Sequence, residues 1–185
     1  MINLIPATLD EFDSVVAFYD EVMERTPNVY QYALWQTGKH PTADGIKAYI
    51  KEGCLYLYKE DGKIVGAMAF PMYQGEDYHP GEWARPLKDD EVAVLHIFAV
   101  SPDMQGKGIG AQMVKAAIEL AREKGRDTVR LDTLATNLPA QHLYTSLGFQ
   151  FRGQQHRPAP EAIPIWIAFP SSWIRWALPV KPVTR

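Results

Sequence analysis

A glycine-rich junction between two apolar segments constrains this chain more than any other feature of its sequence. Three glycines alternate in the run QGKGIG at residues 105–110, after an apolar stretch at 91–100 and at the start of an amphipathic one at 108–124. The first stretch predicts a strand and the second a helix. Glycines let an anion approach the backbone closely, and the first N–H groups of a helix are unpaired and lie at the positive end of its dipole. The junction therefore predicts a phosphate-binding loop, to which Lys107 adds a positive charge.

Two other phosphate-binding patterns compete for this loop. Gly106, Gly108 and Ala111 satisfy the dinucleotide fingerprint G-x-G-x-x-G/A, and Asp132 follows at roughly the distance of a ribose-binding acid. However, residues 101–105 separate the predicted strand from the first glycine, and Asp132 is expected inside a strand rather than at its end. Because of these two departures, a nicotinamide-dinucleotide site remains only an alternative interpretation of this loop. A P-loop is excluded because no Lys-Ser or Lys-Thr follows the glycines.

Hydrophobic periodicity and turn signals predict a mixed α/β fold. An Asp-Gly turn within residues 60–63 predicts a hairpin between strands at 55–59 and 64–70. In the second half of the chain, the order strand, helix, strand, helix, strand predicts a parallel pair joined by a crossover helix. The other predicted strands are at 2–6, 128–134, 149–151 and 162–169, and the other helices follow Thr8 or Asp10, run from Thr42 to about Gly53, and span 139–147.

Composition favours a soluble protein of one domain. The chain has 185 residues, of which 46% are hydrophobic and 22% charged, and its formal net charge is -3. That length supports one compact core, and the charge provides no basic surface for nucleic acid. The single cysteine, Cys54, excludes an internal disulfide and favours a reducing compartment. With no secretory signal and no apolar stretch of membrane-spanning length, we expect a cytoplasmic protein without nucleic-acid or membrane partners.

Two motifs at the right separation resemble the GNAT superfamily of N-acetyltransferases. The segment LHIFAV at 95–100 resembles that family's central strand, and residues 105–110 match its Q/R-x-x-G-x-G/A loop. Downstream, Asn137, Ala140, Tyr144 and Gly148-Phe149 match the pattern N-x-x-A-x-x-x-Y-x-x-x-G-F. The specific match covers about 94–149, whereas residues 2–70 agree in element order. The resemblance implies a mixed sheet of six to seven strands flanked by about four helices, with acetyl-CoA as cofactor.

The resemblance also assigns parts of the chain to the cofactor. The parallel strands are expected to splay at residues 98–100, so that acetyl-pantetheine lies in the gap, while backbone amides of 105–111 take the pyrophosphate. One domain would span 1–185, with a cofactor core at 91–151, acceptor-side elements at 8–53 and 72–90, and an apolar tail at 170–185. No metal is expected. The implied cofactor-binding residues are Phe98, Ala99, Val100, Gln105, Gly106, Lys107, Gly108, Ile109, Gly110, Ala111, Asn137, Ala140 and Tyr144.

Acetyl transfer to an amine requires a base, an oxyanion donor and an acid for the leaving thiolate. Tyr144 occupies the family position that faces the cofactor sulfur and is the predicted acid. The predicted oxyanion donor is a backbone N–H near Phe98 or Ala99. Some relatives carry a glutamate base on the central strand, where this chain has Val94. His96, two residues on and on the same strand face, is the predicted base; Glu91, Asp132 and a water chain are the alternatives.

The acceptor, a small-molecule or peptide amine, is expected to meet aromatic side chains of the early helices and of the loop at 72–90. These would bind an amine through cation–π and charge contacts, or else would only anchor long loops. The tail, with Trp166, Trp173 and Trp176, is expected either to close the sheet of its own domain or to form a homodimer contact. A non-catalytic acyl-CoA-binding sensor remains an alternative function. The acceptor-side residues are Tyr30, Tyr32, Trp35, His40, Tyr73, Tyr78, His79, Glu82 and Trp83.

Overall fold

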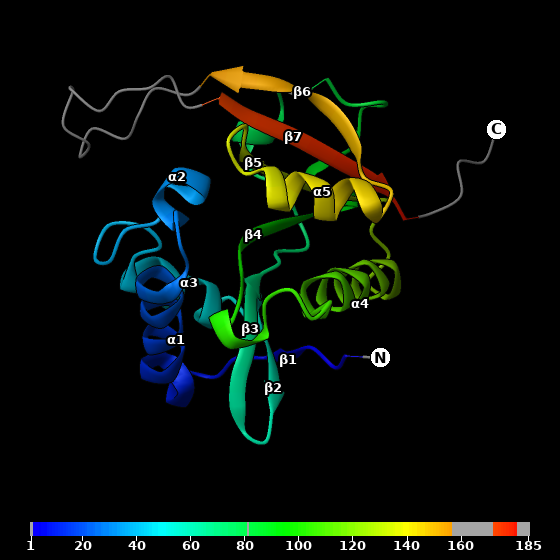
Figure 1. Ribbon diagram of the computed structural model, residues 1–185. Coiled ribbons are helices and arrows are strands. Elements are labelled where there is room, and N and C mark those ends of the chain that lie inside the picture. The colour runs from blue at the N-terminus through cyan, green and yellow to red at the C-terminus, as the bar shows by residue number, and fades with distance from the viewer. Residues whose placement is uncertain (1, 81, 157–171, 181–185) are drawn as a thin grey trace.

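A seven-stranded mixed sheet organises the computed structural model, which describes residues 2–80, 82–156 and 172–180. The strand order is β1-β2-β3-β4-β5-β7-β6 (Figure 1). β4 and β5 run parallel, and every other neighbouring pair runs antiparallel. The predicted mixed sheet of six to seven strands and its parallel pair are therefore confirmed. The strands span Ile5–Pro6 (β1), Leu55–Glu60 (β2), Lys63–Ala69 (β3), Val92–Val100 (β4), Thr128–Leu134 (β5), Gln150–His156 (β6) and Ser172–Pro179 (β7).

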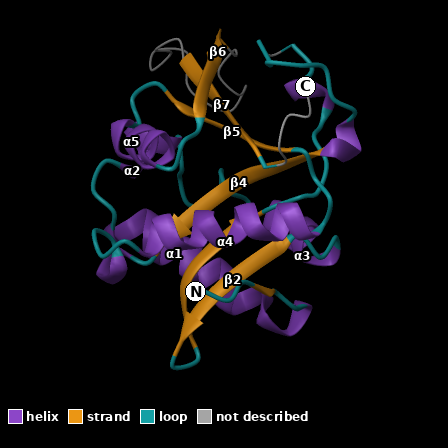
Figure 2. Ribbon diagram, turned by 90° about the vertical axis from the view of Figure 1, so that its right-hand side faces the viewer, coloured by secondary structure: helices purple, strands orange, loops and turns teal. Residues whose placement is uncertain are grey.

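Five α-helices flank the sheet within the described residues, one more than the resemblance implies. They span Phe12–Arg25 (α1), Val29–Ala33 (α2), Ala43–Lys51 (α3), Ile109–Glu123 (α4) and Leu138–Ser146 (α5). The extra helix is α2, which lies in a stretch whose sequence shows no helical periodicity. Figure 2 shows α4 crossing the middle of the sheet, with α5 beside its upper half. No helix among the described residues is long and apolar enough to cross a membrane.

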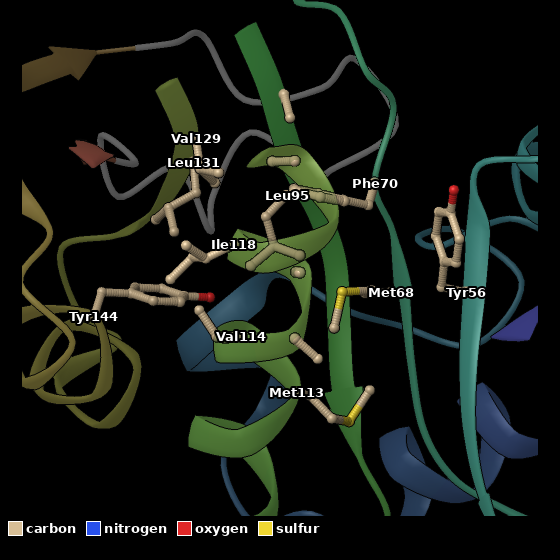
Figure 3. Close-up of a cluster of buried hydrophobic side chains, with 14 of the residues drawn as sticks. Tyr56, Met68, Phe70, Leu95, Met113, Val114, Ile118, Val129, Leu131 and Tyr144 are labelled. Atoms are coloured by element: carbon tan, nitrogen blue, oxygen red, sulfur yellow. The ribbon is translucent and has the colours of Figure 1, made fainter. Parts of the chain in front are cut away.

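The two faces of the sheet bury different helices. The hydrophobic stripe of α1 and α3, including Val15, Tyr19 and Ile46, packs on one face of β2 and β3. The stripe of α4 packs on the other face, where Met113 contacts the apolar side chains of the central strands (Figure 3). The apolar positions recur at helical spacing, which gives each helix one stripe that the sheet buries. α4 is the crossover between β4 and β5, so its N-terminus lies at the carboxyl end of β4.

The C-terminal segment is part of the sheet. β7 pairs with β5 over seven residues, from Thr128↔Pro179 to Leu134↔Trp173, and β6 covers its other edge. Trp176, 7% exposed, belongs to the hydrophobic core. Of the two expectations for the tail, closure of its own sheet is therefore the one that residues 172–179 fulfil. The predicted strand at 162–169 and Trp166 lie outside the described residues.

Candidate active site

β4 and β5 separate before either strand ends. Their parallel pairing runs from Val92↔Thr128 to Leu95↔Leu131, although β4 continues to Val100. At the point of separation Ile97 has φ 39°, and the register with β3 shifts between Ala67 and Ala69. A positive φ is rare for a β-branched residue and marks a bulge that bends the strand. The Tyr19 hydroxyl donates a hydrogen bond of 2.8 Å to the Ile97 carbonyl, which holds the bulge from the α1 side.

A cavity of about 690 Å³ occupies the gap that this separation opens. Its walls are the end of β4, the loop to α4, the end of β5 and the first turns of α5. That volume is within the usual range for a small-molecule site. The predicted catalytic and cofactor-binding residues that line it are His96, Phe98, Val100, Gln105, Gly106, Gly108, Gly110, Ala111, Asn137, Ala140 and Tyr144.

Three predicted cofactor residues lie outside the lining. The side chains of Ala99 and Ile109 are buried in the hydrophobic clusters on opposite faces of the sheet, and the Lys107 side chain is exposed beside Met104. Ala99 pairs with Ala67 on β3, and the next donor on that edge is the Ser101 amide, 2.8 Å from the Val65 carbonyl. Since alternate amides of a strand face the same neighbour, the Ala99 amide points to β3.

The amide of Phe98 points the other way, into the gap between β4 and β5. Pairing with β3 therefore uses the Ala99 amide, and of the two predicted oxyanion donors it is the Phe98 N–H that faces the cavity.

The glycine loop has the backbone that its sequence predicts. Gly106 and Gly108 have φ 74° and 79°, in the left-handed region, and Gly108 is the N-cap of α4. The first intrahelical bond runs from the Gln112 amide to the Gly108 carbonyl, 3.2 Å away, so the amides of 109–111 have no partner within the helix. The Gln105 side chain donates to the Val100 carbonyl and to the Thr26 hydroxyl, at 3.1 and 3.2 Å. The loop is thereby fixed to β4 and to the end of α1.

α5 forms the opposite wall. The Asn137 side-chain oxygen accepts a bond of 3.1 Å from the Ala140 amide and caps the helix. Two turns later Tyr144, 6% exposed, points from α5 toward α4 (Figure 3), and its ring centroid lies 5.7 Å from that of Phe149. Burial, and then the negative charge of Asp132, raise the pKa of Tyr144 above its ordinary value. The hydroxyl is therefore protonated and can donate a hydrogen bond at any physiological pH.

The other end of the cavity is aromatic and carries histidines and carboxylates. Three of the predicted acceptor-side residues line it, namely Tyr32, Trp35 and His40. Tyr49 and Asp77 also line it, although no motif in the sequence singles them out. Tyr49 is one partly buried position among the apolar residues of α3, and only the fold brings that helix to the cavity.

The remaining acceptor-side residues do not line this cavity. Tyr78 lies behind the cavity wall and donates a bond of 2.7 Å to Asp132, which lines the cavity. His79 and Trp83 line a second cavity. Like Tyr78, three more of these residues line neither cavity, namely Tyr30, Tyr73 and Glu82.

His96, the predicted base, lies at this aromatic end of the cavity. Its ring stacks with Tyr49 at 6.3 Å between centroids and meets the edge of Tyr78 at 5.9 Å. Burial, and then the charge of His96, lower the pKa of His40, which places both histidines in one electrostatic environment. Val94, at the family's glutamate position, is fully buried.

Of the two carboxylates considered as alternative bases, Asp132 and Glu91, only one lies at the cavity. Asp132 lines it. Glu91 instead accepts a bond from the Lys88 amide at the opposite end of β4, so the structure places it away from the site.

Comparison with known proteins places these features in a family. An L-methionine sulfoximine/L-methionine sulfone acetyltransferase of Pseudomonas paraeruginosa is 35% identical over 153 residues, which cover 80% of each chain. An uncharacterized N-acetyltransferase of Methanocaldococcus jannaschii is 38% identical over 99 residues, 54% of this chain and 40% of that one. The match to human N-acetyltransferase 8B covers 56% of that protein at 28% identity. The chain thus spans about half the length of several curated relatives that it matches.

Solved structures agree on the fold. An acetyltransferase of Salmonella typhimurium, solved with its cofactor acetyl-CoA, superposes with a TM-score of 0.70 at 16% identity and covers 100% of this chain and 97% of its own. A GNAT-family acetyltransferase of Streptococcus agalactiae gives a TM-score of 0.72 at 18% identity, covering 96% and 95%. The profile of the Acetyltransferase (GNAT) family matches residues 15–149. That match begins within α1, includes the glycine loop and ends just after α5, so it covers more than half of the chain. The protein therefore belongs to the GNAT acetyltransferase family.

Proposed function

We propose that this protein transfers the acetyl group of acetyl-CoA to a primary amine of a small molecule or peptide, directly and within a ternary complex. One observation carries the proposal: the gap between β4 and β5 brings the amides that begin α4, the free edge of β4 and the Tyr144 hydroxyl into a single cavity. The whole chain would act as one domain, since β1 and β7 belong to the same sheet. A cytoplasmic location and a homodimer remain predictions.

The cofactor fits the residues present along the length of the cavity. Amides at 109–111 and the neighbouring glycines would hold the pyrophosphate, with Lys107 adding charge from the rim. The edge of β4 at Phe98 and Val100 offers the pantetheine arm the hydrogen bonds of a missing strand. Asn137 and Ala140 would enclose the arm from the α5 side.

The transfer forms a C–N bond and breaks the C–S bond of the thioester, which is the acetyl donor when acetyl-CoA is bound. His96 would take the proton that the attacking amine loses, with Asp132, which also lines the cavity, as the alternative base. The Phe98 amide would donate to the carbonyl oxygen as negative charge develops there. Tyr144 would donate its hydroxyl proton to the departing thiolate. A buried phenolate is unfavourable, so that proton must be replaced as product leaves.

The test is release of the CoA thiol from acetyl-CoA across amines, polyamines, aminoglycosides, peptides and amino acids, including L-methionine sulfoximine and L-methionine sulfone. Turnover with one amine class is expected. Tyr144→Phe should lower kcat by about 10²-fold or more and keep the thermal shift caused by acetyl-CoA. Tyr73→Phe is the matched control, since Tyr73 is 46% exposed and lies outside the cavity lining. Full activity of Tyr144→Phe would contradict the assigned acid.

A second function, a non-catalytic acyl-CoA sensor, is favoured by the buried Val94 at the position of the family's glutamate. It predicts a thermal shift from acetyl-CoA with no thiol release for any amine. The dinucleotide alternative predicts a shift from NADH instead of acetyl-CoA. If neither cofactor shifts the melting temperature, all three proposals for the cavity are wrong.

A further inference from the structure

A second cavity, of about 360 Å³, lies beneath the loop that joins β3 to β4. Arg130 on β5 lines it together with Gln74, Trp83 and Arg85. The neighbours of Arg130 on its strand pack with α4, so the alternation of side chains along a strand places Arg130 on the opposite face. Nothing in the acetyl-transfer chemistry uses this cavity.

Arg130 is a buried cation with incomplete hydrogen bonding. It is 2% exposed, and its guanidinium lies 3.8 Å from the centroid of the Trp83 ring. Its Nη1 donates to the neutral Gln74 side chain, whereas its Nε is buried without a partner. Nε and Nη2 form the edge of a guanidinium that pairs side by side with a carboxylate. In the described part of the chain that edge has no carboxylate ion-paired to it.

The charges around Arg130 leave its own unbalanced. Asp89, the carboxylate that acts on it, already accepts bonds from His79 and from Gln74 at 2.8 and 2.9 Å. Arg85, in the cavity wall, is paired with Asp127 at 2.9 Å. Burial, and then the neighbouring Arg175 cation, lower the pKa of Arg130 to about 10, so it still carries its charge at neutral pH. A buried cation without an ionic partner is expensive, and an anion would remove that cost.

We propose that this cavity binds the carboxylate of a small organic acid on the Nε edge of Arg130. The lining supports this class over inorganic oxyanions, because Trp83 and Leu87 offer an apolar surface for a hydrocarbon group beside the cation. The planar fork of a guanidinium also matches a carboxylate in two parallel bonds. Arg85 lies in the wall as the second positive group.

Tyr78 separates this carboxylate site from the reaction cavity. Its ring stacks on Trp83 with centroids 6.0 Å apart, and its hydroxyl binds Asp132 on the other side. The Arg175 guanidinium, 1% exposed, donates to the Tyr78 carbonyl from β7 and so fixes the same residue. A carboxylate bound at Arg130 would therefore stabilise the loop that forms one wall of the acceptor end.

Thermal unfolding with acetate, malonate and sulfate as probes, at constant ionic strength, tests the site. The carboxylates should raise the Tm of the wild type saturably by several degrees, beyond the effect of sulfate. Arg130→Gln should abolish that rise and keep the shift from acetyl-CoA. The control Arg122→Gln removes the same charge from the exposed face of α4 and should keep both shifts. An equal rise in Arg130→Gln, or an equal effect of sulfate, would overturn the proposal.

A second readout requires no substitution at Arg130. Malonate should change the tryptophan fluorescence of the wild type with the same saturation midpoint as the Tm series, because Trp83 lies against the guanidinium. Trp83→Phe should remove that change. If the wild type shows no saturable change, or if Trp83→Phe responds identically, the cavity does not bind carboxylates.

Discussion

Gly66 allows α4 to approach β3, and adding one methyl group there should destabilise the protein measurably. An added Cβ would lie 2.3 Å from the Met113 sulfur, 2.8 Å from its terminal carbon and 3.2 Å from the Ala99 carbonyl oxygen, where ordinary contacts are 3.4–4 Å. Met113 is fully buried, so its side chain cannot swing into solvent. Overpacking of this kind costs about 1–3 kcal/mol, and we expect Gly66→Ala to lose that much stability.

A double-mutant cycle separates this clash from other effects of the substitution. Met113→Ala alone should cost about 2–5 kcal/mol by leaving a cavity. Combined with it, Gly66→Ala should cost little more, because the added Cβ then meets only the Ala99 carbonyl oxygen. The coupling free energy is therefore expected to be favourable by about 1–2 kcal/mol.

Urea unfolding followed by tryptophan fluorescence measures all four proteins, and free energies can be compared where the m-values agree. If the two single losses add to within about 0.5 kcal/mol in the double variant, the clash with Met113 is not the cause. Gly66→Ala should also weaken the acetyl-CoA thermal shift, since a displaced α4 moves the glycine loop.

Three further predictions concern groups outside the cavities. Burial raises the pKa of Cys54 to about 12, so a thiol reagent at pH 8 should leave the folded protein unlabelled, and rapid labelling would contradict this. The Lys59 ammonium, then the Thr8 amide, lower the pKa of Glu11 below its ordinary 4.5. Glu11→Gln should therefore reduce stability at pH 7, and its difference from wild type should vanish as pH falls through the folded pKa; a pH-independent difference would refute the pairing. Thr42→Ala should cost about 1 kcal/mol by removing the cap of α3, with Thr42→Ser near wild type.

The elements that the sequence predicts well are those with local causes. β5 has the predicted bounds, Thr128–Leu134, and the hairpin of β2 and β3 turns where Asp-Gly predicts it. Thr42 caps α3, and the glycines at 106 and 108 adopt the left-handed backbone that a sharp turn into a helix requires. In each case the signal and the structure involve residues within one turn or one strand of each other.

Where the conformation or burial of a residue depends on partners far away in the chain, the local sequence does not predict it. Ile97 is a β-branched residue in an apolar strand, yet it adopts φ 39°, because β3 and the Tyr19 hydroxyl hold the bulge in place. No motif in the sequence singles out Arg130 or Arg175. Their burial follows from the loop that covers that face of the sheet.

The sequence alone therefore determined the family, the position of the glycine loop and the identity of Tyr144 as a cavity residue. All three depend on motifs within residues 94–149. Tertiary structure decided that β7 enters the sheet between β5 and β6 and that the Phe98 amide rather than that of Ala99 points into the gap. It also decided that Tyr49 and Asp77 line the aromatic end of the cavity. These features come from the packing of strands and loops that are far apart in the chain. The free energy of that packing depends on both partners, so no single segment of the sequence predicts it.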